Sequence, residues 1–251
     1  KRTVLSPIFL NLANNNFAAS TLPRLFSENR SAQSIDVALS EIARELREEP
    51  NLPIREPFQG YHERVRTCVE SADAVIYLSD YERRCIEYIG AAPRSATLVR
   101  NPVDASGFAS ADPGLFAEHL GIVNYILCVG RIEPRKNQLI LAHAARTMGK
   151  AVVFIGHTEN QAYYDLVREV AGEAGHFIPR IDPADPLLKS AFAGASVFCL
   201  PSWAEGAPLA ALEAAAAGIP MVLSDRSSEQ EYFGDYAEYV NPADVDGLRD
   251  A

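Results

Sequence analysis

Short apolar runs alternate with amphipathic stretches along most of the chain. The apolar runs lie at Val4–Leu10, Ala74–Leu78, Ala96–Val99, Tyr125–Val129, Ala151–Ile155, Phe177–Ile178, Val197–Leu200 and Met221–Leu223. The segments between them with helical periodicity are Ser34–Glu48, Tyr61–Ser71, Tyr81–Ile89, Asn137–Met148, Asn160–Ala174, Leu187–Ala193 and Pro208–Ala217. Buried strands that alternate with helices are typical of parallel sheets covered on both faces. The pattern therefore predicts an α/β protein with doubly wound parallel sheets.

The rhythm is interrupted once, in a stretch rich in small residues, Pro and Gly. We interpret this stretch, Ala105–Gly121, as a connection between two domains. The predicted N-terminal domain then covers residues 1–104 and the C-terminal domain residues 105–251. Because the first is small for a domain of this kind, we expect it to be incomplete.

Composition narrows the possible functions. The chain has 251 residues, 48% of them hydrophobic, which is enough apolar material for a well-buried core. Its formal net charge of -10 argues against a protein that coats nucleic acid, because such proteins need an excess of Lys and Arg. The four cysteines form no C-x-x-C pair and the five histidines are scattered, so we expect neither a metal nor a cofactor. We expect no membrane span and a cytoplasmic protein.

The first candidate motif is Gly130-Arg131-Ile-Glu-Pro-Arg-Lys136-Asn, which follows the run YILCV. Loops after the carboxyl ends of parallel strands are where ligands bind. Gly130 permits a sharp turn, while Arg131 and Lys136 place two cations beside the start of the next helix. Free N–H groups at a helix start add partial positive charge. The motif suits a diphosphate, and the alternative is a solvated basic loop.

The second motif is PSWAEGAPLAALEAAAAGIP, after the run VFCL. Its helix is nearly all Ala and Leu, so a buried Glu213 within it needs hydrogen-bond partners. Two vicinal ribose hydroxyls would supply them, and Glu205 at the loop tip would reach hydroxyls of a sugar. The alternative places Glu205 in solvent and Glu213 on a wet helix face.

Together, in this order, the motifs resemble the GT-B-fold retaining glycosyltransferases of family 4. That family has a GR-x(4)-KN-like loop and, later, two Glu residues separated by seven positions, as Glu205 and Glu213 are. The segment SADAVIYLSDYERRCIEYIG…LVRNPVD also resembles the end of the family's N-terminal domain. The resemblance covers roughly Ser71 to Asn241.

The resemblance implies two Rossmann-like domains and transfer of a sugar from a nucleotide diphosphate sugar to an acceptor hydroxyl, with retention and without a metal. It assigns Arg131 and Lys136 to the diphosphate, Glu205 to the transferred sugar and Glu213 to the ribose. It also implies backbone contacts near Gly130 and at the helix entry. The entry residues are Gly206, Ala207 and Leu209.

The chain departs from the family pattern at two turns. Ala207-Pro208 replaces the commoner Phe-Gly and removes one backbone donor, and Asn101-Pro102 stands where Asn-Gly is usual. The family's Gly-rich loop near the start of its N-terminal domain, with its acceptor site, is not visible. Two alternatives therefore remain: a non-catalytic module that binds a nucleotide sugar, and another GT-B relative such as an epimerase.

The expected partners are a nucleotide sugar and a carbohydrate or lipid-linked acceptor. A lipid-linked acceptor leaves open a peripheral contact with the inner face of the membrane. The pattern Asp244-Val-Asp246 is formally a D-x-D metal motif, but it follows Asn241-Pro242 in what reads as a loop. We interpret it as a loop without a metal.

Overall fold

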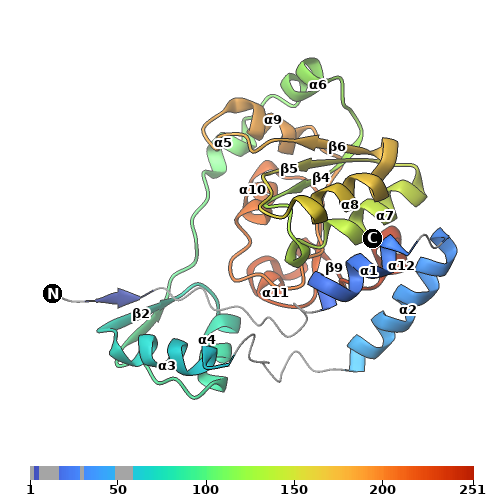
Figure 1. Ribbon diagram of the computed structural model, residues 1–251. Helices are drawn as coiled ribbons and strands as arrows, with labels where there is room; N and C mark the ends of the chain where they lie inside the picture. Colours follow the sequence, from blue (N-terminus) through green and yellow to red (C-terminus); the bar gives the residue numbers. More distant parts are fainter. Residues whose placement is uncertain (1–2, 6–16, 29–30, 49–58) are drawn as a thin grey trace.

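The computed structural model describes residues 3–5, 17–28, 31–48 and 59–251, and these contain two separate parallel sheets (Figure 1). The smaller sheet has the order β1-β2-β3. Its strands and the helices beside them are Val4–Leu5 (β1), Ala74–Tyr77 (β2), Ala96–Leu98 (β3), Tyr61–Ser71 (α3) and Asp80–Tyr88 (α4). A small apolar core, which includes Val69, Val75 and Ile86, holds this unit together.

The larger sheet has the order β6-β5-β4-β7-β8-β9, and every neighbouring pair is parallel. Its strands are Tyr125–Val129 (β4), Ala151–Ile155 (β5), Gly175–Ile178 (β6), Val197–Leu200 (β7), Met221–Ser224 (β8) and Glu238–Val240 (β9). The chain moves outward from β4 through β5 and β6, then returns to β7 beside β4 and moves the other way. The order reverses between β4 and β7, so the chain runs in opposite directions away from these two neighbouring strands.

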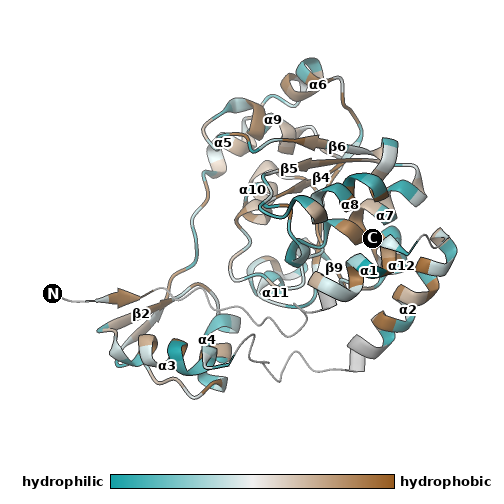
Figure 2. Ribbon diagram, viewed as in Figure 1, coloured by the Kyte–Doolittle hydropathy of each residue, from teal (hydrophilic) through white to brown (hydrophobic). Residues whose placement is uncertain are grey.

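Helices cover both faces of the larger sheet. They are Gln138–Met148 (α7), Gln161–Ala171 (α8), Pro186–Ala193 (α9), Leu209–Ala217 (α10), Glu229–Phe233 (α11) and Val245–Asp250 (α12), with short 3₁₀ turns at Pro134–Lys136, Gly172–Ala174 and Gly234–Tyr236. The central strands are apolar and the exposed sides of the helices polar (Figure 2). In α10, Ala211 and Ala214 are fully buried, and their small side chains let the helix lie close to β7 and β8.

Two helices from the beginning of the chain pack on the larger unit. A π-helical turn at Phe17–Thr21 leads into Leu22–Ser27 (α1), and Ala32–Glu48 (α2) follows. The apolar side chains of Leu22 and Leu39 are fully buried in the larger core. The packing of α1 and α2 therefore does not follow the predicted division at residue 104.

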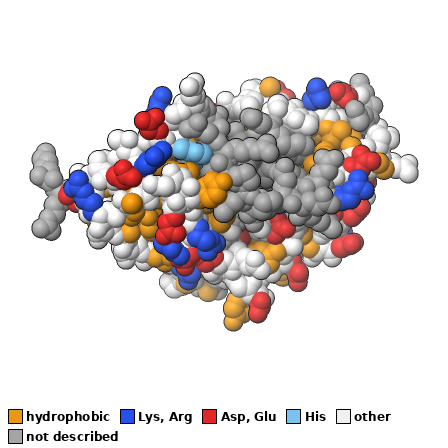
Figure 3. Space-filling model, turned by 90° about the horizontal axis from the view of Figure 1, so that it is seen from below, with side chains coloured by type: hydrophobic (Ala, Val, Ile, Leu, Met, Phe, Trp, Pro, Cys, Tyr) orange, Lys and Arg blue, Asp and Glu red, His pale blue; other side chains and the backbone are white. Residues whose placement is uncertain are grey.

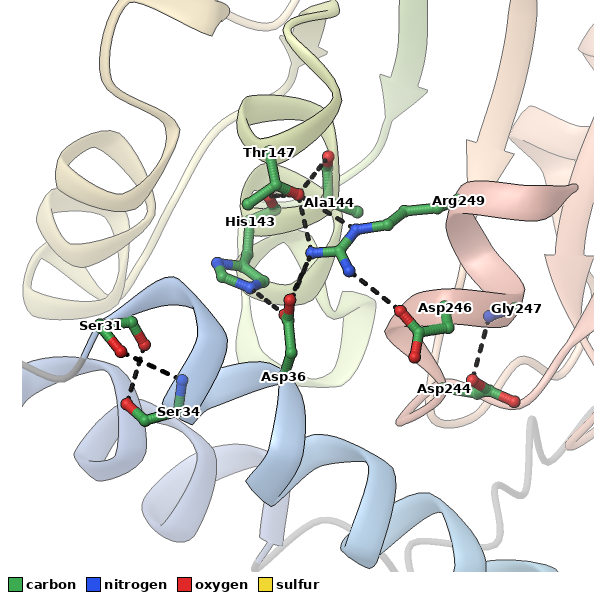
Figure 4. Close-up of polar contacts among 10 residues, drawn as sticks. All are labelled: Ser31, Ser34, Asp36, His143, Ala144, Thr147, Asp244, Asp246, Gly247 and Arg249. Atoms are coloured by element: carbon green, nitrogen blue, oxygen red, sulfur yellow. Dashed lines mark hydrogen bonds and ion pairs between the residues drawn. The ribbon is translucent and has the colours of Figure 1, made fainter.

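An ion-pair cluster fixes α2 (Figure 4). Asp36 Oδ1 lies 2.7 Å from His143 Nε2 on α7 and 3.0 Å from Arg249 Nη2 on α12. Arg249 also donates to Thr147 Oγ1 at 2.8 Å. One carboxylate thus ties α2 to two helices of the larger unit. Because all these side chains are half-buried or better protected, the pairs are less screened than surface pairs.

The predicted connection Ala105–Gly121 is instead largely helical. It forms Ala105–Ala109 (α5) and Gly114–Leu120 (α6), and α5 packs on α9 and α10. Phe108 and Phe116 are buried, and the ring of Phe108 meets that of Phe192 edge to face at 5.4 Å. Two aromatic anchors outweigh the turn-forming residues around them. The extended connection between the units is the exposed stretch at 99–104.

The predicted α/β class with doubly wound parallel sheets is confirmed for the larger unit, and the smaller sheet is a partial version of the same design. The strands β4, β5 and β7 have the predicted bounds. Asp244 accepts from Gly247 N at 3.0 Å and so caps α12, while Asp246 pairs with Arg249 at 3.0 Å. The D-x-D pattern is therefore a helix start. The predicted strand Val4–Leu10 lies partly outside the described residues.

Candidate nucleotide-sugar site

Both predicted motifs lie at the carboxyl edge of the larger sheet, on either side of the reversal point. The first follows β4 and the second follows β7, and these strands are hydrogen-bonded neighbours. In doubly wound sheets the ligand crevice is found at this place. The topology therefore brings together two loops that are about 70 residues apart in the sequence.

The loop after β4 is held by a close backbone approach. Gly130 has φ 153°, and its N–H donates to Ile155 O at 3.0 Å. A Cβ on Gly156 would lie 1.9 Å from Gly130 O, so only glycine fits at position 156. Sequence reasoning singled out Gly130 but missed Gly156, whose signal was its place directly after the run AVVFI.

Asn137 joins this loop to its neighbours. It adopts the left-handed conformation with φ 60°, which Asn tolerates better than most residues. Its Nδ2 donates to Pro201 O at 3.0 Å and to Pro242 O at 2.8 Å, and the side chain is fully buried. Asn137 thereby fixes the start of α7 against the loops that follow β7 and β9.

Lys136 and Glu205 form the central contact of the site. Lys136 Nζ lies 2.5 Å from Glu205 Oε1, and the two side chains are only 12% and 5% exposed. Burial by itself would raise the pKa of Glu205, but the charges of Lys136 and Arg135 outweigh it, so the net shift is downward. Glu205 is therefore ionised over the neutral range. The predicted solvent-facing alternative for Glu205 is excluded by its burial.

Arg135 is the cation that sequence reasoning missed. Its Nη1 donates to Ala204 O at 2.6 Å and lies 3.6 Å from Glu205 Oε2, and its own carbonyl accepts from Trp203 N at 2.8 Å. Arg135 therefore fastens the two motif loops to each other. The sequence Pro134-Arg135-Lys136 does not indicate that Arg135, and not its basic neighbours, makes these contacts.

Arg131 has a different environment. Its guanidinium is 49% exposed and lies 3.3 Å from Glu133 Oε1, which also accepts from Arg135 Nη2 at 2.6 Å. Its carbonyl accepts from Gln138 Nε2 at 2.8 Å. The structure thus anchors the backbone of Arg131 and leaves its charged head accessible at the carboxyl edge of the sheet.

Helix α10 begins at the site with an open end. Its N-cap is Pro208, and among the described residues no side chain caps the helix. Gly206 is buried, Ala207 half-buried, and Leu209 53% exposed, so the first turn borders solvent. Glu213 lies one turn further on the same helix face as Leu209. Burial raises the pKa of Glu213 to about 7.

The loop after β8 holds Glu205 from behind. Glu205 N donates to Ser227 Oγ at 2.7 Å, and Ser227 Oγ donates to Glu229 Oε2 at 2.8 Å. Ser228 Oγ donates to Glu205 O at 3.4 Å. Glu229 is fully buried, and burial together with the charge of Glu205 raises its pKa to about 8. No feature of the sequence analysis pointed to these residues.

The site concentrates charged side chains. On the face seen from below in Figure 3, basic and acidic side chains lie interspersed. In the site, three cations (Arg131, Arg135 and Lys136) lie beside the carboxylates of Glu133 and Glu205 and near an open helix start. The excess of positive charge favours an anion, and the carboxylates favour a ligand that also carries hydroxyl groups. Within the described ranges, no cluster of three His, Cys, Asp or Glu side chains is arranged to hold a metal ion.

The comparisons with known proteins agree with this geometry. Residues 123–251, just over half of the chain, match the family model described as "Glycosyl transferases group 1". The chain belongs to the group 1 glycosyltransferase family. The matched residues include both motif loops and the segment that holds Glu205.

A comparison with an individual curated protein covers more of the chain than the family model does. The chain is 27% identical over 194 residues to O-antigen chain mannosyltransferase B of Escherichia coli, which covers 72% of this chain and 50% of that protein. The chain thus spans about half the length of this curated relative.

Solved structures show the same fold. Sucrose-phosphate synthase from Thermosynechococcus elongatus superposes with a TM-score of 0.68 at 21% identity, covering 84% of this chain and 55% of that one. HepE from Anabaena, solved with UDP and glucose, gives a TM-score of 0.68 at 16% identity, covering 95% of this chain and 72% of that one. These likenesses confirm the predicted GT-B type of fold, with the N-terminal domain present only in part. None of the described helices is long and apolar enough to cross a bilayer.

Proposed function

We propose that this group 1 glycosyltransferase chain carries the donor-binding half of a retaining enzyme that moves a sugar from a nucleotide diphosphate sugar to an acceptor hydroxyl. The observation that carries the proposal is the buried contact of Lys136 with Glu205, at 2.5 Å, across the reversal point of the larger sheet. Membership of the family and the structure of HepE with UDP and glucose support the donor class.

The diphosphate would bind to the loop after β4. Lys136 carries three N–H donors, of which Glu205 uses one, so two remain for phosphate oxygens. Arg131 supplies an accessible fork that suits two phosphate oxygens at once. Glu205 holds the ammonium in place before a ligand arrives, so little side-chain freedom is lost on binding.

The sugars of the donor would contact the two carboxylates. Glu205 faces the transferred sugar, and its position is fixed by Lys136, Arg135 and the clamp on its backbone. Glu213, one turn into α10, accepts the ribose hydroxyls. Both carboxylates can only accept hydrogen bonds when ionised, which matches the vicinal hydroxyls of a sugar. Burial raises the pKa of Glu213, and ribose hydroxyls that donate to it would favour its ionised form and so lower that pKa.

Transfer needs no nucleophile from this chain. The bond between the anomeric carbon and the phosphate oxygen breaks, and the acceptor hydroxyl bonds to the face that the diphosphate vacates. The hydroxyl proton passes to the departing phosphate oxygen. Lys136, Arg131 and the open start of α10 stabilise the charge that develops on the leaving group. We propose no metal for this step, and a carbohydrate or lipid-linked molecule as the acceptor.

A second candidate is a module that binds the nucleotide sugar without transferring it. It is favoured by Ala207-Pro208 at the entry of α10, where the proline removes one backbone donor toward the sugar and leaves the side chains assigned to the nucleotide in place. The two candidates share the donor site and differ only in turnover.

Thermal melting with UDP, GDP and ADP tests the shared part. A ligand at 100 times its dissociation constant stabilises the folded state by about 2.7 kcal/mol. Lys136→Ala should abolish the shift, while the exposed Lys150→Ala should retain it. A wild-type melting temperature that none of the nucleotides raises would refute the donor site. Release of free sugar from the matching donor then separates the enzyme from the binding module.

A further inference from the structure

The segment that clamps Glu205 continues into a contact between the two units. After Ser227 and Ser228 the chain enters α11, where Glu231 accepts from Asp80 N at 2.7 Å and from Tyr81 N at 3.0 Å. These two N–H groups belong to the first turn of α4 in the smaller unit. The donor side thus holds the smaller unit by the backbone at a helix start.

Two neighbouring N–H groups at this helix start have local partners. Ser79 is the N-cap and accepts from Glu82 N at 3.0 Å, while Glu82 Oε2 accepts from Leu78 N at 2.8 Å. This arrangement resembles a capping box, although Glu82 accepts from Leu78 N and not from the N-cap N–H, and neither of its bonds uses the N–H groups of Asp80 and Tyr81. Both oxygens of Glu231 accept from those two groups, and the positive end of the helix favours its charge.

Two further contacts surround the same point. Tyr232 OH donates to Leu78 O at 2.6 Å, and Arg100 Nη2 lies 3.4 Å from Glu231 Oε1. The guanidinium of Arg100 also lies over the ring of Tyr232, 5.5 Å from its centroid. Glu231 is 18% exposed, so water competes only weakly for its oxygens.

The contact joins the carboxyl edges of the two sheets. Leu78 directly follows β2, and Ser227 to Tyr232 follow β8. Six consecutive residues, 227–232, therefore touch both the backbone of Glu205 and the first turn of α4.

We propose that Glu231 is a positioning residue, which with Tyr232 holds the smaller unit at the mouth of the donor site. The role in transfer rests on the proposed function, whereas the hold itself does not. When the hold is lost, the units separate and the sugar-bearing end of the donor site is exposed to water. Donor binding, which depends on Lys136 and Glu213, persists.

The hold is tested by a distance between spin labels. One label is placed on the native Cys68 of α3, which is exposed, and the other on a Lys150→Cys substitution in the larger unit. Glu231→Ala and Tyr232→Phe should each broaden the distance distribution, and together they should raise the separated population by roughly tenfold. Glu231→Gln should give an intermediate result, because its amide oxygen can accept only one of the two bonds.

Matched controls lie a few residues further along the chain. Glu238 and Tyr236 are exposed, Tyr236 by 89%, so Glu238→Gln and Tyr236→Phe should leave the distribution unchanged. A distribution that stays narrow in the doubly substituted protein would overturn the proposal. Equal broadening in the controls would do the same.

Kinetics then test the positioning role. In Glu231→Ala we expect kcat for transfer to fall roughly tenfold with nucleotide affinity within a factor of about two of wild type. Loss of nucleotide affinity with unchanged kcat would refute a positioning role. Because the label distances need no nucleotide, a failure of the proposed function leaves the distance result standing. If the distance measurement instead shows no contact between the units, the result for nucleotide binding by the wild type is unaffected.

Discussion

Glu229→Gln should stabilise the protein, and the gain should increase with pH. Glu229 is fully buried, and its pKa is raised from 4.5 to about 8 by burial first and by the charge of Glu205 second. Between these two values the folded protein keeps a proton that the unfolded chain has released. A folded state that binds more protons loses stability as the pH rises. The wild type is therefore penalised above pH 4.5, and glutamine, which has no proton to lose, is not.

The size of the effect follows from the shift. Each unit of pKa corresponds to about 1.4 kcal/mol, so the free energy of unfolding of Glu229→Gln should gain about 1.4 kcal/mol on the wild type per pH unit between pH 5 and 8. The full difference has an upper bound of about 5 kcal/mol at pH 8 and above. Glutamine keeps an oxygen that accepts from Ser227 Oγ, so the clamp on Glu205 remains intact.

The assay is urea unfolding at pH 5, 6, 7 and 8, followed by the fluorescence of Trp203. This is the chain's one tryptophan, it is buried, and it is two residues from Glu205. Glu238→Gln, at an exposed position, serves as the control and should show no such trend. A difference between Glu229→Gln and wild type that is constant with pH, or that shrinks as the pH rises, would refute the reasoning.

Three further predictions follow from single contacts. Glu213→Gln should weaken nucleotide binding more at pH 8, where Glu213 is ionised, than at pH 6. Calorimetric titration measures the two affinities, and an equal loss of affinity at both pH values would contradict the ribose role. Gly156→Ala should lower stability by roughly 1–3 kcal/mol, because its Cβ would strike Gly130 O, and an unchanged melting temperature contradicts this close approach. Asp36→Ala should free α2 to limited proteolysis by removing its bonds to α7 and to Arg249, and cleavage at the wild-type rate contradicts the anchoring.

The local pattern of the chain was sufficient for the longer strands and helices and for the place of the site. Strands such as Tyr125–Val129 and Val197–Leu200 are short apolar runs between segments with helical periodicity. A strand that is buried on both faces needs apolar residues at nearly every position, so its sequence is easy to recognise. Parallel strands put their following loops on one edge, so GRIEPRKN and PSWAEG were bound to lie at the same edge. The prediction that Lys136 and Glu205 share a site rested on that rule together with the resemblance to the family.

Contacts between segments that are distant in the sequence could not be predicted from the pattern of apolar and polar residues. Arg131 and Arg135 are chemically equivalent in the sequence, and only the path of the loop decides that Arg135 reaches Ala204 O while Arg131 stays half exposed. Gly156 is required by the carbonyl of another strand's loop. Nothing local marks such an approach.

The late part of the chain shows the same limit most clearly. Helices α11 and α12 and strand β9 are only three to six residues long, too short for a periodic signal, and went unpredicted. Their segment nevertheless contains Glu229 and Glu231, which owe their roles to burial and to the exposed backbone of α4. The sequence by itself determined the longer strands, the loops that carry the two motifs and the edge of the sheet that these loops share, because periodicity and strand direction are local properties. The tertiary structure alone decided which charges pair, which carboxyl group keeps its proton and where the two units touch, because those depend on distances between residues far apart in the chain.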